Sequence, residues 1–311
     1  MQKVCYTFSV NVRTKGVKPS VKQKIKQSAL ALLAVLLCCT LCSCSFSLNG
    51  LLTRIKDYVN GDETVPVPAD FVETRESGDY TYDAYLTYAV ITKYLGEQTS
   101  VNIPATIDGL PVKRIGSLAF YTCVDVVSVV LPEGIEGVED NAFYYCTGLA
   151  SVTLPSTLTS LGAKSFSWCS SLTAITLPAG ITAIPEFCFN QCAALESVVF
   201  QGKIRSVGAR AFSGCAALLK ADFGEELLSI GEFAFRGDTS LVYMTLPGNC
   251  NLGEDVFGGC SETFTAVVPA GTACALACEQ MGVHIAAEVP EMPEKPAETS
   301  EESGVSDIVL E

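Results

Sequence analysis

Residues 135–180 read IEGVEDNAFYYCTGLASVTLPST and then LTSLGAKSFSWCSSLTAITLPAG, two consecutive blocks of 23 residues with the same order of apolar positions. Six complete blocks follow one another from Val112, and a shortened seventh block ends the array. One column of the alignment holds a phenylalanine in every block: Phe120, Phe143, Phe166, Phe189, Phe212, Phe235 and Phe257. A fixed period of this length is typical of repeat proteins, so the sequence predicts a solenoid.

Each block contains a short segment in which apolar and polar residues alternate, for example Ser-Val-Thr-Leu-Pro at residues 151–155. Alternation of this kind is typical of a strand with one buried face, and the proline after it ends the pairing. We therefore expect Val152 and Leu154 to point into the core. The rest of each block, of the type Ile-Gly-x-x-Ala-Phe-x-x-Cys, is expected to form a short turn. The prediction is an α/β solenoid of about seven 23-residue repeats, with short strands plus short helical or 3-10 turns.

The motif IGxxAFxxCxxLxxVxLP is near-complete in four of the seven blocks, and AVITKYLGEQTSVNIPATIDGLPVKRIGSLAF leads into them at residues 89–120. Over about residues 86–286 the chain resembles the BspA-like branch of leucine-rich-repeat proteins. The resemblance implies a bacterial surface or secreted protein, often an adhesion or host-contact module. It also implies repeats without an enzymatic active site, and it names no ligand.

Both ends of the array need caps, because a terminal repeat would otherwise expose an apolar face. Before the repeats we expect strands at 88–94 and 101–104. After the repeats we expect a helix over 273–281 that ends at Gly282, followed by a final strand. The predicted organisation is a lipoprotein signal peptide at 1–43, a tether at 44–79, N-terminal cap strands at 80–111, leucine-rich repeats at 112–270, a C-terminal cap at 271–286 and an acidic disordered tail at 287–311.

The first 43 residues carry seven basic side chains and no acidic one. Residues 22–26 (KQKIK) precede an apolar run over 29–41, which is the order found in a secretory signal. As a helix this run spans only ~20 Å, less than the ~30 Å of a bilayer core. It ends in Leu-Cys-Ser-Cys, which resembles the bacterial lipobox and predicts a lipid on Cys44. Cys42 is a poorer candidate, because a leucine would precede it, and the alternative of a buried helix conflicts with the basic flank.

The chain after residue 43 is strongly acidic, with 13 basic against 34 acidic side chains. A product this acidic repels phosphate backbones and anionic headgroups. We therefore expect no nucleic-acid partner, and membrane attachment through the lipid alone.

Cysteine recurs three residues after the phenylalanine column, at Cys123, Cys146, Cys169, Cys192, Cys215 and Cys260, with Asp238 as the exception. We expect a ladder of free, buried thiols, because parallel side chains suit a disulfide poorly. The pair Cys188 and Cys192, and the pair Cys274 and Cys278, have a spacing that could chelate a metal. The first pair is better explained by packing and the second has only His284 as a further ligand. No metal site and no cofactor are therefore predicted.

Catalytic candidates are few. His284 is the single histidine, so a Ser or Cys nucleophile with an imidazole base is disfavoured, and no enzymatic activity is expected. Exposed residues that depart from small polar types are the better candidates for a ligand surface: Tyr121, Tyr144, Tyr145 and Trp168 near the phenylalanine column, and Lys220, Asp222 and Tyr243 on the strand face. The alternative for the four aromatic residues is that they only cover the edge of the cysteine ladder.

The function predicted from these observations is that of a cell-surface lipoprotein whose solenoid binds an extracellular protein or glycan in adhesion or host contact. Its predicted location is the cell membrane or cell surface after export. The alternative is a structural spacer or envelope component without a specific ligand. A binder should concentrate varied side chains on one exposed face, and a spacer should not.

Overall fold

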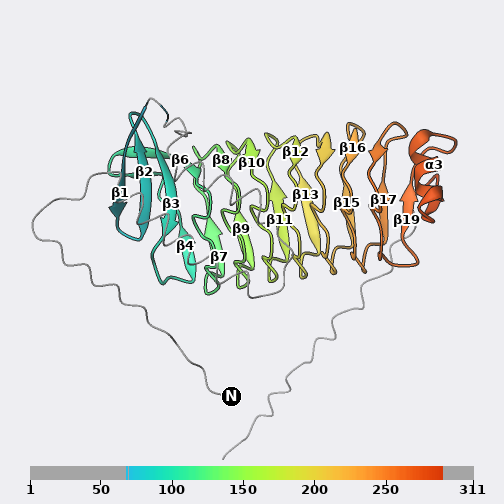
Figure 1. Cartoon of the computed structure of the whole chain (residues 1–311), viewed down its shortest axis with the longest axis horizontal. Helices are drawn as coiled ribbons and strands as arrows, with labels where there is room; N and C mark the ends of the chain where they lie inside the picture. The colour runs from blue at the N-terminus through green and yellow to red at the C-terminus, as the bar shows by residue number, and fades with distance from the viewer. Residues whose placement is uncertain (1–67, 69, 290–311) are drawn as a thin grey trace, which may run out of the picture. The chain divides into compact units, whose positions relative to one another are not determined.

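The alternating segments of the repeats form parallel strands that stack into one sheet. The computed structural model describes residue 68 and residues 70–289, and within them a nine-stranded sheet follows the order β20-β19-β17-β15-β13-β11-β9-β7-β4 (Figure 1). Its strands are β4 (Ser100–Asn102), β7 (Ser128–Val130), β9 (Ser151–Thr153), β11 (Ala174–Leu177), β13 (Ser197–Phe200), β15 (Lys220–Asp222), β17 (Tyr243–Thr245), β19 (Thr265–Val267) and β20 (His284–Ala286). Ile175 pairs with Val198, so neighbouring strands are one 23-residue repeat apart.

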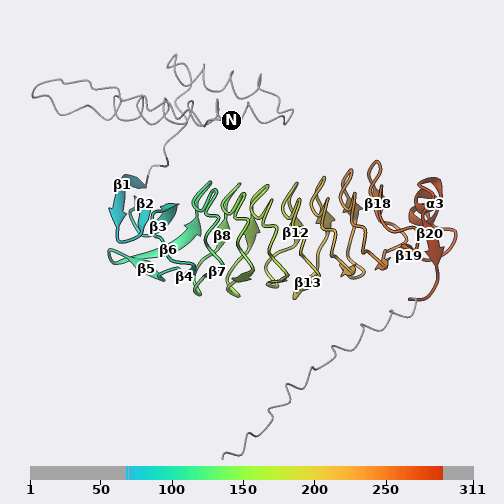
Figure 2. The ribbon, with the colours of Figure 1, turned by 90° about the horizontal axis from the view of Figure 1, so that it is seen from below.

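A second column of short strands lies after the first in each repeat. It comprises β6 (Leu110–Ile115), β8 (Gly137–Val138), β10 (Ser160–Leu161), β12 (Ala183–Ile184), β14 (Ser206–Val207), β16 (Ser229–Ile230) and β18 (Asn251–Leu252). The strands β12, β14, β16 and β18 form a four-stranded sheet, while β6, β8 and β10 continue the sheet of the N-terminal cap. In Figure 2 the short strands β12 and β18 lie apart from β13, which belongs to the nine-stranded sheet.

The segment around each phenylalanine, expected to form a short helical or 3-10 turn, forms single turns closed by bonds between residues three apart and no helix. The amide of Tyr121 donates to the carbonyl of Leu118 (3.1 Å), whereas the amide of Phe120 donates to Ala142 in the next repeat (2.7 Å). Bonds within a turn therefore alternate with bonds between turns, and a regular helix cannot do this because all of its bonds stay inside one segment. In the part of the chain that the structure describes, α3 (Ala273–Gln280) is the one α-helix. The fold is a β-solenoid with leucine-rich repeats, and the α/β class expected from the sequence is not confirmed.

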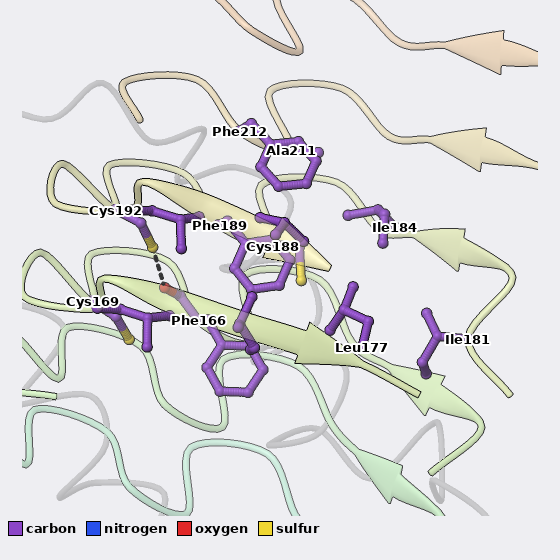
Figure 3. Close-up of a cluster of buried hydrophobic side chains, with 14 of the residues drawn as sticks. Phe166, Cys169, Leu177, Ile181, Ile184, Cys188, Phe189, Cys192, Ala211 and Phe212 are labelled. Atoms are coloured by element: carbon purple, nitrogen blue, oxygen red, sulfur yellow. Dashed lines mark hydrogen bonds between the residues drawn. The ribbon is translucent and has the colours of Figure 1, made fainter. Parts of the chain in front are cut away.

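The core is a stack of equivalent side chains, as the repeat columns predict. The phenylalanine rings are stacked from turn to turn, with centroids 5.2 Å apart between Phe143 and Phe166 and 5.7 Å apart between Phe166 and Phe189. Figure 3 shows this stack beside the cysteine column, in which the thiol of Cys192 donates to the carbonyl of Phe166 (3.2 Å). No repeat buries these faces alone, so stability depends on contacts between neighbouring turns.

The N-terminal cap begins earlier than the sequence predicts. The strands β1 (Phe71–Ser77), β2 (Tyr80–Tyr85) and β3 (Ala89–Tyr94) form an antiparallel meander, and β5 (Thr106–Ile107) pairs with β6. The expected tether at 44–79 therefore contains β1. Most residues of β1 are exposed, so its sequence lacks the alternation of apolar and polar residues that marks the other strands. The cap closes the phenylalanine stack, because the ring of Tyr94 lies 5.0 Å from that of Phe120.

The C-terminal cap agrees with its prediction. Thr272 caps α3, since its hydroxyl accepts from the amide of Ala275 (3.3 Å), and Gly282, with φ of 74°, follows its end. The strand β20 then adds to the main sheet. Within residues 70–289 the solenoid thus has about nine turns rather than seven, because each cap contributes a strand (β4 and β20) beside the seven repeat strands.

Several predictions fall on residues outside this description. The signal peptide at 1–43, the lipid site Cys44 and the acidic tail from residue 290 onward are among them. None of the helices in the described residues is both long enough and apolar enough to span a bilayer.

Candidate functional site

The turn segments carry the exposed side chains that set this surface apart. In each turn the residue two positions before the phenylalanine and the residue two positions after it have left-handed backbone angles. The first column holds Leu118, Asn141, Lys164, Phe187, Arg210, Phe233 and Asp255, and the second holds Thr122, Tyr145, Trp168, Gln191, Gly214, Gly237 and Gly259. Side chains in these columns repeat one above another along the stack.

Four aromatic residues of this region, Tyr121, Tyr144, Tyr145 and Trp168, form what we call the aromatic patch. The rings of Tyr121 and Tyr144 are stacked, with centroids 5.8 Å apart. Tyr144 and Tyr145 follow at 6.2 Å, and Tyr145 and Trp168 at 5.7 Å. Tyr145 is 42% exposed and Trp168 37% exposed. The structure therefore joins the four residues into one continuous aromatic surface over three successive turns.

The backbone at the patch is energetically unfavourable for its residues. Tyr145 and Trp168 each have φ of 63°, whereas the same column holds glycine at Gly214, Gly237 and Gly259. A bulky residue in this region is an outlier and costs about 1–2 kcal/mol relative to the right-handed region. Aromatic side chains are therefore kept at positions where the last three repeats hold glycine.

Covering the cysteine column does not require aromatic residues. Cys215 follows Gly214 directly and is still completely buried, as is Cys192 after Gln191. A small or polar residue thus suffices beside Cys192 and Cys215, whereas Cys260, which follows Gly259 at the end of the stack, is half-buried.

The other three candidates lie elsewhere on the repeats. Lys220 and Asp222 are exposed on β15 and pair in register with Tyr243 and Thr245 of β17. The carboxylate of Asp222 accepts a hydrogen bond from the amide of Gly224 (3.1 Å), so it closes its own loop. The seven predicted residues therefore belong to two surfaces, the turn segments of the first three repeats and the strand face of the fifth and sixth.

Sequence reasoning missed a row of stacked cations and rings beside the patch. Arg210 lies over Phe187 and Phe233, with its guanidinium carbon 5.7 and 4.8 Å from the ring centroids. Lys164 lies over Phe187 from the other side (5.2 Å), and Arg236 over Phe233 (5.4 Å). Lys164, Phe187, Arg210 and Phe233 recur every 23 residues in one column, and that alternation was a signal in the sequence.

The cysteine column carries protonated thiols rather than nucleophiles. Burial raises the pKa of Cys146 and of Cys260 to about 12. Cys260 and His284 both line an open hollow of about 380 Å³ at the C-terminal end, but the Cys260 thiol donates to the carbonyl of Phe235 (3.1 Å). Within the described residues no hydrogen bond joins His284 to Cys260. The hollow therefore lacks an activated nucleophile.

The pairs of cysteines considered as metal ligands have different surroundings. Cys188 is completely buried and lies 3.3 Å from the hydroxyl of Ser165, in the small-residue column where packing predicted it. Cys274 and Cys278 are buried on α3. Among the described residues there is no group of three or more histidine, cysteine or acidic side chains arranged to hold a metal ion.

Comparisons with known proteins agree with this architecture. The family model for the BspA type leucine rich repeat region matches in six copies, over residues 113–241 and 162–272, which together span just over half of the chain. No match is found among curated proteins.

Solved structures of leucine-rich-repeat proteins are similar to the chain. The leucine rich repeat protein TpLRR of T. pallidum is 29% identical, with 71% of this chain and 97% of that protein covered and a TM-score of 0.53. A leucine rich cell surface protein from Faecalibacterium prausnitzii is 20% identical, with 64% and 77% covered and a TM-score of 0.39. The pneumococcal vaccine antigen PcpA is 17% identical, with 65% and 51% covered and a TM-score of 0.45. Only the first of these has a TM-score above 0.5, so only the first supports the fold.

Proposed function

Because the chain belongs to the family of BspA-type leucine-rich-repeat proteins, we propose that it is an exported binding module, displayed at the cell surface, whose ligand is an extracellular protein or glycan. The aromatic patch is the proposed contact surface. Large aromatic side chains on a rigid support contribute strongly to binding, because they bury much apolar area and lose little conformational entropy. The proposal assigns no enzymatic role.

The single observation that carries the proposal is the backbone geometry of the patch. Tyr145 and Trp168 occupy left-handed positions that hold glycine in later repeats, and they remain exposed. Unfavourable backbone conformations with exposed side chains are typical of functional surfaces, where binding offsets the loss of stability. Phe187 and Phe233 are also left-handed but stack with Arg210, whereas the rings of Tyr145 and Trp168 stay more than a third exposed, which favours a binder over a spacer.

The outward strand face is a poorer candidate for the same ligand. Its outward positions in the first four repeats hold small side chains, namely Ser128, Val130, Ser151, Thr153, Ala174, Thr176, Ser197 and Val199. Such residues offer little contact area per side chain, and hydroxyls are the only hydrogen-bonding groups that their side chains carry. Variety is therefore concentrated on the turn segments, as expected of a binder.

Replacing Tyr145 and Trp168 together by alanine tests the proposal. A glycan and host-protein array probed with the wild-type chain first identifies a retained ligand, and the double variant should lose at least tenfold in its retention. Its thermal unfolding curve should hardly change, because both side chains are at the surface.

The matched control is Thr122→Ala with Gln191→Ala. These residues lie in the same left-handed column, at φ of 57° and 61°, but carry no aromatic ring. The control should bind as the wild type does. Equal retention by both double variants, or a wild-type chain that retains no ligand on the array, would refute the proposal and favour the spacer.

Surface display rests on the N-terminal sequence rather than on the solenoid. The basic residues at 22–26, the apolar run at 29–41 and the lipobox-like ending at Cys44 support export and lipid anchoring. Two acyl groups on Cys44 would hold the protein on a bilayer stably, since each buried methylene contributes ~0.8 kcal/mol.

A further inference from the structure

Two groups of the described cysteines have different surroundings. Five thiols of the repeat column donate to a main-chain carbonyl of the preceding turn: Cys146 to Phe120 (2.9 Å), Cys169 to Phe143 (3.3 Å), Cys192 to Phe166 (3.2 Å), Cys215 to Phe189 (3.2 Å) and Cys260 to Phe235 (3.1 Å). A thiol held in this way has the backbone as its partner. The repeat column therefore uses cysteine as a small packing residue with one donor.

The second group consists of Cys250, Cys274 and Cys278, which we call the cap cluster. Cys250 directly precedes β18, and Cys274 and Cys278 lie on α3. All three are at most 3% exposed. The thiols of Cys250 and Cys278 lie close enough to that of Cys274 to shift its pKa. The hydrogen bond that the structure gives the Cys250 thiol is a long one, to the carbonyl of Asn251 (3.9 Å), so this sulfur is held less firmly than those of the repeat column.

Backbone contacts bring the last repeat and the capping helix together at this point. The amide of Cys274 donates to the carbonyl of Gly248 (3.3 Å), and the amide of Cys250 donates to Pro247 (3.0 Å). The helix α3 also packs against β18. The backbones of Cys250 and Cys274 are thus held near each other, one in the last repeat and the other in the capping helix.

We propose that Cys250 and Cys274 form a disulfide when the chain meets an oxidising environment, and that this bond fastens α3 to the last repeat. Cys278 is the poorer partner for Cys274, because residues four apart on one helix face project side chains in parallel. Cys250 approaches from outside the helix and is free of that restriction. Exported proteins encounter such an environment, where disulfides persist.

The chemistry needs one small-molecule disulfide, such as oxidised glutathione, as oxidant. The thiolate of Cys274 attacks one sulfur of the oxidant, whose S–S bond breaks and releases one glutathione thiolate. Cys250 then loses its proton to solvent and attacks the Cys274 sulfur, which expels the second glutathione. Two protein thiols are oxidised, and one disulfide is reduced to two thiols.

The thiolate is the reactive form of cysteine, so the exchange proceeds through the small thiolate fraction of Cys274. Because the three thiols are buried in the folded chain, the oxidant reaches them when α3 opens or before it has folded. Terminal elements open more readily than the middle of a stack.

Peptide mapping of the full-length chain tests the proposal. After equilibration with mixtures of oxidised and reduced glutathione, free thiols are blocked with N-ethylmaleimide and the digest is weighed by mass spectrometry. A peptide with Cys250 should be joined to a peptide with Cys274, while Cys278 and the repeat-column thiols carry the blocking group. The oxidised chain should melt roughly 5–10 °C above the reduced one.

Two variants separate the cap cluster from its alternatives. Cys274→Ser should lose both the cross-linked peptide and the melting shift, whereas Cys278→Ser should keep both. Three free cap thiols at the most oxidising mixture, or a bridge between Cys274 and Cys278 that survives in Cys250→Ser, would overturn the proposal. Retention of one equivalent of zinc that protects the three thiols from N-ethylmaleimide would also overturn the proposal. If Cys274→Ser fails to fold, the map of the wild-type chain still decides.

Discussion

Asp238 occupies the position of the repeat column that holds cysteine in the other repeats, and its side chain is completely buried. One carboxyl oxygen accepts from the amide of Cys215 (2.9 Å), while the other has no partner among the described residues. Burial raises the pKa of Asp238 to about 9 from its usual 3.8, although backbone hydrogen bonds oppose this. The buried carboxyl group is therefore protonated at neutral pH in the folded chain.

This shift predicts that stability falls as pH rises. The folded state holds a proton that the unfolded state releases above pH 3.8, so the stabilisation is complete below that pH and is lost as pH rises towards 9. At pH 7 the loss amounts to on the order of 4 kcal/mol. Asp238→Asn removes the titrating group, so its melting temperature should fall less between pH 5 and pH 8 than that of the wild type. Parallel melting curves of the two chains against pH would contradict the assignment.

Individual residues also show the limit of reasoning from repeat columns. Burial of Cys188 was predictable, because its column accepts alanine or cysteine and so demands a small side chain. The cysteine column is buried as expected in its middle, while Cys123 and Cys260 at its ends are half-buried. The contacts of Cys250 with Cys274 were not predictable, because Cys250 belongs to a truncated repeat and Cys274 to a cap outside the period. Their proximity depends on how α3 packs.

At the scale of elements, the turn segments rely on close approach between repeats. A Cβ atom on Gly208 would lie 2.5 Å from the backbone nitrogen of Glu186 in the preceding turn. Because backbone atoms cannot rotate away, the two turns would have to separate. The amide of Gly208 donates to Ile184 (2.8 Å), so this shift would also weaken a bond between turns.

Gly208→Ala should therefore destabilise the solenoid by roughly 1–3 kcal/mol, the range of overpacked core sites. Chemical denaturation with far-UV circular dichroism as the signal measures this change. Glu139→Ala serves as a control in the same column, where a side chain is already present, and it should cost less than about 1 kcal/mol because it removes only surface contacts. Equal losses in the two variants would show that close approach is not the cause.

The elements differ in how far sequence predicts them. Strands such as β9 and β11 follow from alternation, which is a local signal. The turn segments do not, because Tyr145 and Trp168 adopt left-handed angles against their own preference. Hydrogen bonds to the next turn, such as Trp168 to Asn190 (2.8 Å), hold them there. A bond to a residue one repeat away has no signature in a local window.

At the scale of the whole molecule, the solenoid carries the proposed binding surface and Cys44 the proposed anchor. In a detergent phase separation, Cys44→Ala should move the protein from the detergent phase to the aqueous phase, because acylation of Cys44 would be lost. Cys42→Ala is the control and should stay in the detergent phase. Unchanged partitioning of Cys44→Ala would remove the lipid anchor from the proposed function and leave the binding surface untouched.

The amino-acid sequence alone predicted the 23-residue period, the core columns and the strands of the main sheet, because each of these leaves a repeated or local pattern of apolar residues. It did not predict β1 or the second column of short strands. Only the tertiary structure decided that Tyr121, Tyr144, Tyr145 and Trp168 form one surface at left-handed positions, and that the cap cysteines meet. The physical reason is that these arrangements depend on contacts between stacked turns, and between the last turn and α3. Such contacts join residues that are far apart in the chain.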